Sequence, residues 1–324
     1  MMQGLDLHRA FFEKCGLPLL REAFPKELPK LAIASVGFGS DRWRADDEHS
    51  RDHCWEPGFQ LFSARLNRET LKAIEAFLFE KLPWTFQGYK RTDCPGSVNG
   101  IRAWTIDEFF QSMTSFAWPP TDDVPWLRIT EEALFHATNG EVFYDPTGDL
   151  TTRRKAFGYY PENVWRFKLA VRAHSAEVQH YHLERILARN DGIAAEVILA
   201  DGAREVMYFA FLLNKRYAPY DRWLHWGFRQ LPLLSARIEP LFIELYQTAD
   251  WPKRQALYQK ILDVCSDYTY SEGLATKKQY WWLDLWETVQ GELRNVPFPG
   301  FPGAEFRFTS QFALGADLRR LFGL

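Results

Sequence analysis

Apolar residues recur with two different periods along this chain, and the change between them falls near residue 150. Before that point, short apolar runs predict strands at 31–36, 59–62, 101–105 and 141–145. After it, strand patterns become rare and long stripes of helical period follow one another. We therefore predict an α+β protein, with an N-terminal α/β domain over residues 1–150 and an all-α helical bundle over residues 151–324.

Helices are expected between the strands of the first domain. Apolar positions predict two short helices at 6–15 and 18–24, and a clear amphipathic helix at 67–81. Asn67 precedes the amphipathic helix, where its side chain suits an N-cap. A further helix is expected to start near Ile106.

The second half reads as a series of helices separated by turn residues. Pro161 is well placed to open the first of them, and the sequence Asn190-Asp191-Gly192 ends it. The following helices are expected at 193–215, 221–247, 251–266 and 271–294.

Composition narrows the class of protein. A hydrophobic content of 46% with 25% charged residues is that of a soluble globular protein, and a net charge of −3 without basic runs disfavours general nucleic-acid binding. The four cysteines form no CxxC pair, so a structural zinc site is not expected. Charges within the first 20 residues and the lack of an 18-residue apolar run predict no signal peptide, no membrane span and a cytoplasmic location.

The segment 37–61 contains candidate residues for binding phosphate and a metal ion. An expected strand runs into Gly39 and Ser40, and Asp52 follows twelve residues after the serine. A tight loop of small residues exposes backbone N–H groups and a hydroxyl that suit a phosphate. Acidic residues two apart on a following strand can hold divalent metal ions that bridge nucleotide phosphates. This pattern predicts phosphate binding at Gly39 and Ser40, with Asp52 as the metal ligand.

These residues also resemble a known family. The sequence is similar to the DUF4037 family, a domain of unknown function placed with the polymerase β-like nucleotidyltransferases. The resemblance extends over residues 31–232, and it is carried by the motifs at 36–40, 46–48, 50–53, 140–146, 159–165 and 213–220. It implies a polymerase β-like fold for the first domain and a helical bundle like those of antibiotic nucleotidyltransferases for the second. It further implies a nucleoside triphosphate (NTP) and Mg²⁺ as ligands.

The acidic strand departs from the family pattern, which is Asp-His-Asp-Trp-Gly. Here the residues are Asp52-His53-Cys54-Trp55-Glu56, so a thiol stands where a metal-binding carboxylate is expected. We consider Asp52, Cys54 and Glu56 as the catalytic positions. Compensation by Glu56 is disfavoured, because an ideal strand separates it from Asp52 by about 13 Å. The resemblance to polymerase β-like enzymes also implies a third carboxylate on a neighbouring strand. Asp107 and Glu108, just past the end of the strand expected at 101–105, are the candidates, although a role as charges at a helix N-terminus explains them more simply.

Two other readings use the same residues. His49, His53 and Cys54 could bind a soft metal such as Zn²⁺ only if 49–54 were helical, which the pattern does not favour. Cys54 could act as a nucleophile beside His53, although neighbours on a strand point to opposite faces. The plainest reading makes Cys54 a small buried residue.

The helical half offers a basic and aromatic cluster. Lys215, Arg216 and Tyr220 are candidates for binding phosphates or stacking on a base, with Tyr217 and Trp223 beside them. The alternative is that the basic residues complement a helix C-terminus. Lys168 and Arg172 share a helical face and could add positive charge, but such residues more often form a solvated face. His180 and His182 are read as surface or packing residues.

Two hypotheses follow from these patterns. The first is a nucleotidyltransferase-like protein that binds an NTP and Mg²⁺ in a cleft between the domains and transfers NMP to a hydroxyl of an unknown acceptor. The second is a catalytically degenerate relative that keeps the fold as a ligand-binding or regulatory module. They differ in whether the site works with Cys54 in place of an acid.

Overall fold

The computed structural model describes residues 2–51, 55–91 and 100–296. These residues form two compact units, each of which draws on two stretches of chain. Unit 1 contains residues 1–119 and 133–158, and unit 2 contains residues 120–132 and the chain from 159 onward. The change of architecture thus comes eight residues after the predicted junction at 150, and the short segment 120–132 joins the helical unit.

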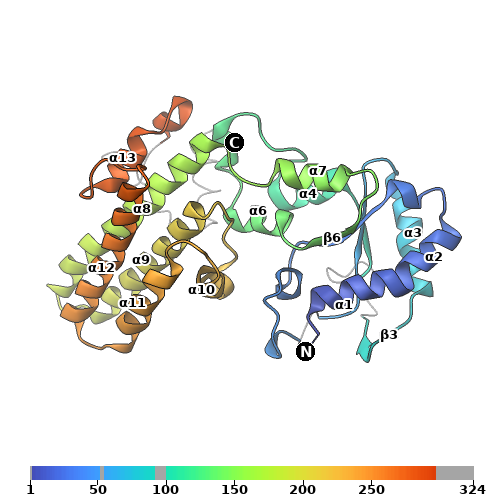
Figure 1. The fold of residues 1–324 in the computed structure, drawn as a ribbon, viewed down its shortest axis with the longest axis horizontal. Coiled ribbons are helices and arrows are strands. Elements are labelled where there is room, and N and C mark those ends of the chain that lie inside the picture. The colour runs from blue at the N-terminus through green and yellow to red at the C-terminus, as the bar shows by residue number, and fades with distance from the viewer. Residues whose placement is uncertain (1, 52–54, 92–99, 297–324) are drawn as a thin grey trace. The chain divides into compact units, whose positions relative to one another are not determined.

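The centre of unit 1 is a small mixed sheet (Figure 1). Its strands lie in the order β5 (Arg102–Thr105), β2 (Gln60–Ser63), β1 (Ala32–Ser35) and β6 (Glu141–Tyr144). β1 pairs antiparallel with both β2 and β6, whereas β2 and β5 run parallel. A separate hairpin is formed by β3 (Thr85–Phe86) and β4 (Tyr89–Lys90).

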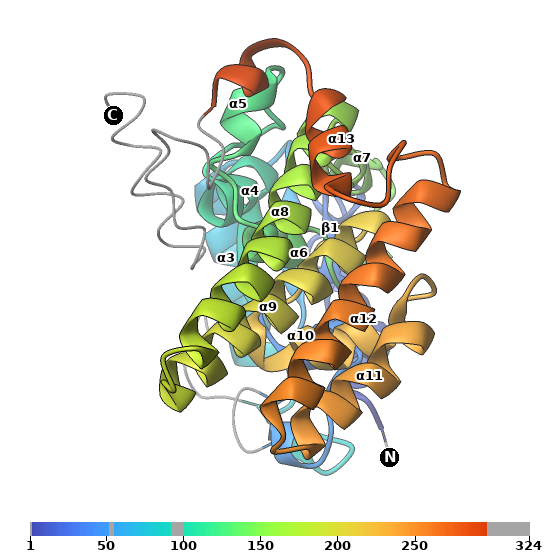
Figure 2. The same cartoon turned by 90° about the vertical axis from the view of Figure 1, so that its left-hand side faces the viewer.

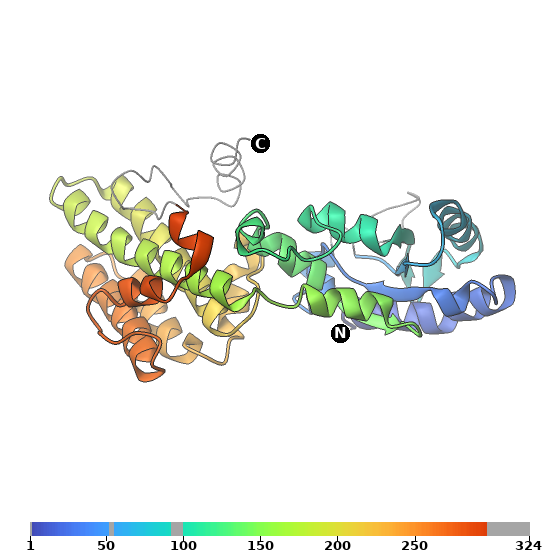
Figure 3. The same ribbon diagram turned by 90° about the horizontal axis from the view of Figure 1, so that it is seen from above.

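Helices surround this sheet. The α-helices of unit 1 are α1 (Gly4–Phe11), α2 (Leu17–Ala23), α3 (Arg68–Lys81), α4 (Ile106–Thr114) and α7 (Asp149–Ala156), and α6 (Glu131–Thr138) enters it from unit 2. A π-helical turn, η1 (Phe12–Gly16), joins α1 to α2, and 3-10 turns are found at η2 (Leu28–Lys30), η3 (Ser40–Trp43) and η4 (His49–Arg51). Figure 3 shows α7, α4 and the N-terminal helices from above.

Local sequence signals account for several of these elements. Asn67 caps α3 as predicted, since its side chain accepts a hydrogen bond from the Thr70 N–H at 2.8 Å. The buried positions of α3 pack with α1, η1, β1 and β2 into one core, formed by residues such as Phe11, Phe12, Ile33, Phe59, Leu61, Leu71 and Ile74. This core holds β1 and the residues that follow it in place.

Unit 2 is a bundle of helices (Figure 2). Its elements are α5 (Asp123–Trp126), α8 (Glu162–Leu187), α9 (Gly192–Leu213), α10 (Asp221–Arg229), α11 (Ser235–Gln247), α12 (Trp251–Ser271), α13 (Trp281–Glu287) and η5 (Gly291–Asn295). α8 packs along α9, and α12 packs against both α8 and α11. The mixed α+β class predicted from the sequence is therefore confirmed.

Some predicted elements differ in extent. The stretch 55–59 is not a strand, because the chain bends at Glu56 and Pro57 and β2 begins at Gln60. The single helix predicted at 221–247 is two helices, interrupted where Leu234 takes a left-handed conformation with φ of 71°. The predicted helix 271–294 contains only α13 and η5, and the Pro/Gly loop at 297–303 lies outside the described residues.

Across the part of the chain that the structure describes, none of the helices combines the length and apolar character needed to cross a membrane.

Candidate functional site

The loop that follows β1 is held to its surroundings by three hydrogen bonds with the side chains of Asn139 and Gln60. Asn139 accepts from the Gly37 N–H at 3.0 Å and donates to the Gly37 carbonyl at 2.9 Å. Gln60 of β2 accepts from the Val36 N–H at 3.0 Å. Gly37 and Gly39 both have positive φ, 97° and 117°, which glycine adopts without a steric cost. The loop 36–40 is therefore a fixed, glycine-dependent turn.

Three successive N–H groups of the loop have no hydrogen-bond acceptor among the described residues. The N–H groups of Phe38, Gly39 and Ser40 donate to none of the described residues, and the Ser40 hydroxyl also has no partner there. Phe38 is 47% exposed, and Gly39 and Ser40 are half-buried. Consecutive unengaged N–H groups on a rigid loop form a concentrated positive potential, which suits an anion. The role predicted for Gly39 and Ser40 in phosphate binding stays a prediction.

A buried histidine supports the loop from beneath. His8 of α1 is 1% exposed, and its Nε2 lies 2.9 Å from the Glu56 carbonyl oxygen. Because a carbonyl only accepts, Nε2 carries the proton, and Nδ1 accepts from the Ser35 hydroxyl at 2.7 Å. Burial, reinforced by the Arg42 charge, lowers the pKa of His8 to about 3. His8 is therefore a neutral connector between α1, β1 and residue 56.

Asp41 lies against His8 on the buried side of the loop. Its Oδ2 is 3.4 Å from His8 Nε2, and the residue is 2% exposed. Burial raises the pKa of Asp41 to about 6, against the opposing effect of the Arg42 guanidinium. The Arg42 side chain in turn donates to the Val36 carbonyl. The Arg42 guanidinium thus joins the start of η3 to the end of β1, whereas the contact between Asp41 and the neutral His8 is not an ion pair.

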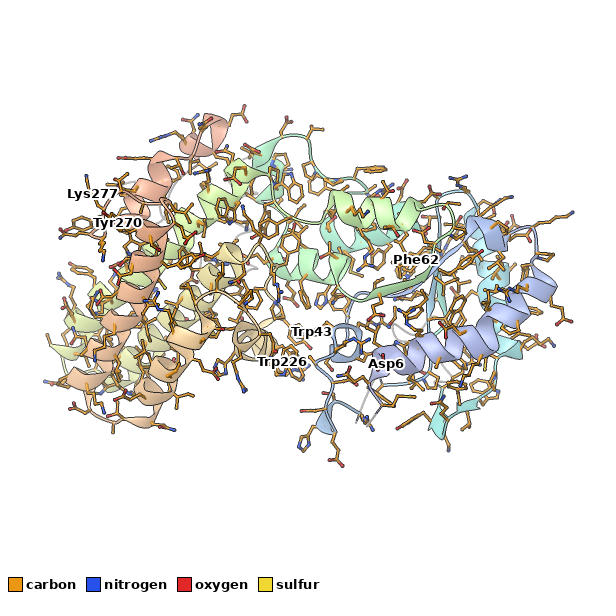
Figure 4. The ribbon with its side chains drawn as sticks, viewed as in Figure 1. Asp6, Trp43, Phe62, Trp226, Tyr270 and Lys277 are labelled. Carbon is orange, nitrogen blue, oxygen red and sulfur yellow. The ribbon has the colours of Figure 1, made fainter. Side chains whose placement is uncertain are left out.

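An exposed ion-pair network lies at the rim of the loop. Arg44 donates to Asp6 at 3.0 Å and to Glu141 at 2.9 Å, and Arg9 pairs with the same glutamate. Figure 4 labels Asp6 on α1 and Trp43, the neighbour of Arg44, on the turn. Asp46 accepts from the Gly4 N–H at 2.8 Å. These contacts join α1 and β6 to the loop. The carboxylates of Asp6, Asp46 and Glu141 are therefore engaged in structural contacts.

Of the three predicted catalytic positions, the structure describes only Glu56. Asp52 and Cys54 lie outside the described residues, as does His53, so the roles predicted for them stay predictions. Glu56 is buried, at 7% exposure, and its negative charge acts on the buried guanidinium of Arg91. Arg91 also donates to the Leu82 carbonyl at 2.7 Å. Glu56 therefore has a structural counter-charge in place.

The weak candidates for a third carboxylate have structural partners. Glu108 forms a capping box with Thr105, each side chain bonding the backbone N–H of the other residue at 3.2 Å. Asp107 accepts from the buried Arg153 at 2.7 Å. These contacts favour the helix N-terminal reading of both residues.

The described residues do not by themselves make a metal site. No group of three or more His, Cys, Asp or Glu side chains within them is arranged to hold a metal ion. Near the loop, Asp46 Oδ2 accepts from the Gly4 N–H and from the Trp55 indole. Asp41 Oδ2 and Asp46 Oδ1 are buried without a hydrogen-bond partner among the described residues, but no third ligand joins them there. His49, one member of the alternative soft-metal set, is exposed on η4. We therefore derive no chemical step through Mg²⁺ or another ion.

The candidates in unit 2 lie between α9 and α10: Lys215 and Arg216 follow the C-cap of α9, and Tyr220 is the N-cap of α10. Lys215 is placed 3.0 Å from the centre of the Trp165 ring and 3.2 Å from a Glu162 oxygen. Arg216 is exposed. Tyr220 is half-buried, and the guanidinium of Arg222 lies 5.5 Å from its ring centre. Lys215 thus already has a carboxylate and an aromatic partner, whereas Arg216 presents its side chain to solvent.

The expectation that Lys168 and Arg172 form a solvated face is wrong. Lys168 is buried in unit 2, and the Arg172 side chain, which is only 14% exposed, pairs with Glu131 at 3.2 Å and with Glu205 at 2.9 Å. Opposite charges from two other elements make their burial tolerable. His180 is half-buried against Tyr258, in line with the packing reading.

Sequence reasoning missed the residues that position the loop. His8 could have been noticed, because Gly4 and Phe11 share its helical face and are buried. Asn139 and Gln60 gave no such signal, since their partners lie 102 and 24 residues away.

Comparison with known proteins gives one family match. Residues 126–224 match the family model described as a domain of unknown function, DUF4037. The predicted DUF4037 resemblance is confirmed for this segment, while the motifs at 36–53 lie outside the matched range. No curated protein matches the sequence. A crystal structure of a nucleotidyltransferase-like protein from Exiguobacterium sibiricum is similar at 11% identity, covering 94% of this chain and 88% of that chain with a TM-score of 0.40.

Proposed function

We propose that this chain is a nucleotidyltransferase-like protein whose loop 36–40 binds the phosphates of a nucleoside triphosphate. The observation that supports the proposal is the set of three consecutive unengaged N–H groups at Phe38, Gly39 and Ser40, on a loop fixed by Asn139. Gly39 and Ser40 are the two residues for which the sequence pattern predicts phosphate binding. A fixed loop binds an anion without first having to order its donors, which favours affinity.

Transfer of NMP to a hydroxyl acceptor is the reaction that the resemblance implies. As the sequence predicts, Asp52 would be the principal metal ligand, and a bound Mg²⁺ would supply charge stabilisation for the transferring group. The direct test is incubation with α-labelled NTPs, Mg²⁺ or Mn²⁺, and candidate hydroxyl acceptors. Labelled product that disappears in Asp52→Ala supports transfer; no product with any metal contradicts it.

A second candidate function has its own observation. Cys54 replaces an expected acid, and Glu56 is buried beside Arg91 instead of standing free to replace it. This arrangement favours a degenerate relative that binds an NTP without efficient transfer, as a ligand-binding or regulatory module.

The variant Cys54→Asp separates the two functions. If Cys54 alone interrupts a working site, the substitution raises turnover. For a degenerate module, NTP binding persists and turnover stays at background in both proteins. Wild-type turnover that depends on Asp52 would exclude the module.

A further inference from the structure

Four charged side chains lie together in the interior of unit 2, on three helices; three of these residues are buried, and the Arg172 side chain is 14% exposed. Glu131 is at the start of α6, Lys168 and Arg172 are on α8, and Glu205 is on α9. Arg172 bridges the two carboxylates, at 3.2 Å from Glu131 and 2.9 Å from Glu205. The Lys168 Nζ lies 3.8 Å from the same oxygen of Glu131. Two positive and two negative side chains balance, so the cluster carries no net charge when all are ionised.

The Glu131 end of this cluster is incompletely hydrogen-bonded. Glu131 Oε2 and the Tyr160 hydroxyl are both buried without a hydrogen-bond partner among the described residues. The Lys168 ammonium donates no hydrogen bond to a described residue, since 3.8 Å is an ion-pair distance only. Buried polar groups are almost always paired in folded proteins, because leaving them unpaired costs free energy.

Glu131, Tyr160 and Lys168 are close enough to influence one another electrostatically. The Lys168 Nζ is 4.9 Å from the centre of the Tyr160 ring, and the Glu131 charge, together with burial, raises the pKa of the Tyr160 hydroxyl. Burial lowers the pKa of Lys168 to about 8, as expected for an ammonium poorly supplied with acceptors. Trp126 and Tyr217 contact the Tyr160 ring at 5.9 and 5.0 Å, so the ring is held in place.

By contrast, the neighbouring groups are satisfied. The Tyr159 hydroxyl donates to the Leu212 carbonyl at 3.3 Å, and Arg172 uses both sides of its guanidinium. The unmet hydrogen-bonding capacity is therefore confined to one acceptor, one ammonium donor and one hydroxyl that can do either. All of these residues lie within the segment 126–224 that matches the DUF4037 model.

We propose that Glu131, Tyr160 and Lys168 bind a neutral amide edge, an N–H beside a C=O, of the kind found on nucleobases and carboxamides. The N–H would donate to Glu131 Oε2, and the carbonyl would accept from Lys168 and Tyr160. A charged ligand is disfavoured, because the buried charges already cancel and an added charge would be uncompensated. This inference is independent of the function proposed for unit 1, since such a ligand need carry no phosphate.

Calorimetric titration of the full chain with small neutral probes tests the proposal. Uridine and guanosine present the amide edge on a base, and nicotinamide presents it as a carboxamide. The matched compounds 3-methyluridine, 1-methylguanosine and N,N-dimethylnicotinamide lack the N–H. We expect at least one parent compound to bind, and its methylated counterpart to bind at least tenfold more weakly. Failure of all three parents to bind, or equal binding of the methylated forms, would overturn the proposal.

Two tyrosine variants supply the matched control. Tyr160→Phe removes an unpaired hydroxyl, so it should leave the melting temperature unchanged or raised while weakening the probe at least tenfold. Tyr159→Phe removes a hydroxyl that is bonded to Leu212, so it should lower the melting temperature and leave probe binding intact. Unchanged binding in Tyr160→Phe, or a loss of stability there as large as in Tyr159→Phe, would contradict the assignment.

Discussion

Asn139 and Gly37 lie 102 residues apart in sequence and bond each other twice, with the asparagine amide accepting from the glycine N–H at 3.0 Å and donating to its carbonyl at 2.9 Å. One side chain thereby replaces a strand partner for the residue at which β1 turns into the loop. The orientation of the free N–H groups at Phe38, Gly39 and Ser40 depends on this contact.

Replacing the asparagine should affect both folding and binding. In Asn139→Ala the Gly37 N–H loses its acceptor, although His136 Nδ1 remains 3.2 Å from the Gly37 carbonyl. We expect a loss of about 1–3 kcal/mol in unfolding free energy, measured by urea titration, together with weaker NTP binding. Asn67→Ala is the control, because loss of the α3 cap costs about 1 kcal/mol without touching the loop. Equal NTP affinities in the two variants would refute the role of Asn139.

The buried pair His8 and Asp41 predicts a specific pH dependence. Asp41 has a folded pKa of about 6, above its ordinary value of 3.8, so its ionisation destabilises the fold as pH rises from about 4 to 6. His8 acts in the opposite sense: with a folded pKa of about 3, its contribution is present above pH 6.5 and is lost as pH falls toward 3.

The variant Asp41→Asn isolates the carboxylate. It resembles the protonated aspartate, so its stability relative to wild type should rise between pH 4 and pH 7. A difference of about two pKa units, at 1.36 kcal/mol each, gives about 3 kcal/mol as the upper scale of the effect. Urea unfolding at several pH values measures it, with the exposed Glu48→Gln as control. A stability difference that stays constant with pH would show that Asp41 does not titrate in this range.

Gly140 lies where β6 approaches the end of β1. A Cβ there would come within 2.0 Å of the Ser35 carbonyl oxygen, and the residue has φ of 76°. Gly88 also has positive φ, 86°, but a Cβ there would meet nothing within 4 Å. In both alanine variants, strain from the left-handed backbone conformation should lower the free energy of unfolding by about 1–2 kcal/mol. In Gly140→Ala, overpacking should lower it by roughly a further 1–3 kcal/mol. Thermal unfolding measures the stability of the two variants. Equal losses of stability would show that a side chain at residue 140 does not clash with the Ser35 backbone.

Local patterns were sufficient for much of the fold. α3 follows from its apolar stripe and the Asn67 cap, and the break between α8 and α9 follows from Asn190, which takes a left-handed conformation with φ of 57°. β1 and β6 follow from short apolar runs. Each of these signals is contained in a few neighbouring residues, which is why the sequence alone reveals them.

Long-range contacts set the remainder. From the sequence, Arg172 was expected to be solvated. The fold instead brings Glu131 and Glu205, which are 41 and 33 residues away, into contact with it. Similarly, Glu56 was expected on a strand with Asp52, but the chain bends at Glu56 and Pro57. The Glu56 side chain is buried, and its charge acts on Arg91. The role of His8 depends on Ser35 and on the residue 56 carbonyl, and no local pattern encodes those partners.

Phosphate binding by the loop 36–40 is tested most directly by calorimetric titration of the four NTPs, with and without Mg²⁺, into wild type, Ser40→Ala and Ser112→Ala. Ser112 is an exposed serine of α4 in the same unit, away from the loop in sequence, and among the described residues its hydroxyl bonds only the Phe109 carbonyl of its own helix. We predict that wild type and Ser112→Ala bind an NTP with equal affinity and that Ser40→Ala binds about tenfold more weakly, a difference of about 1.4 kcal/mol. Absence of NTP binding to the wild-type protein, or full binding by Ser40→Ala, would contradict the account.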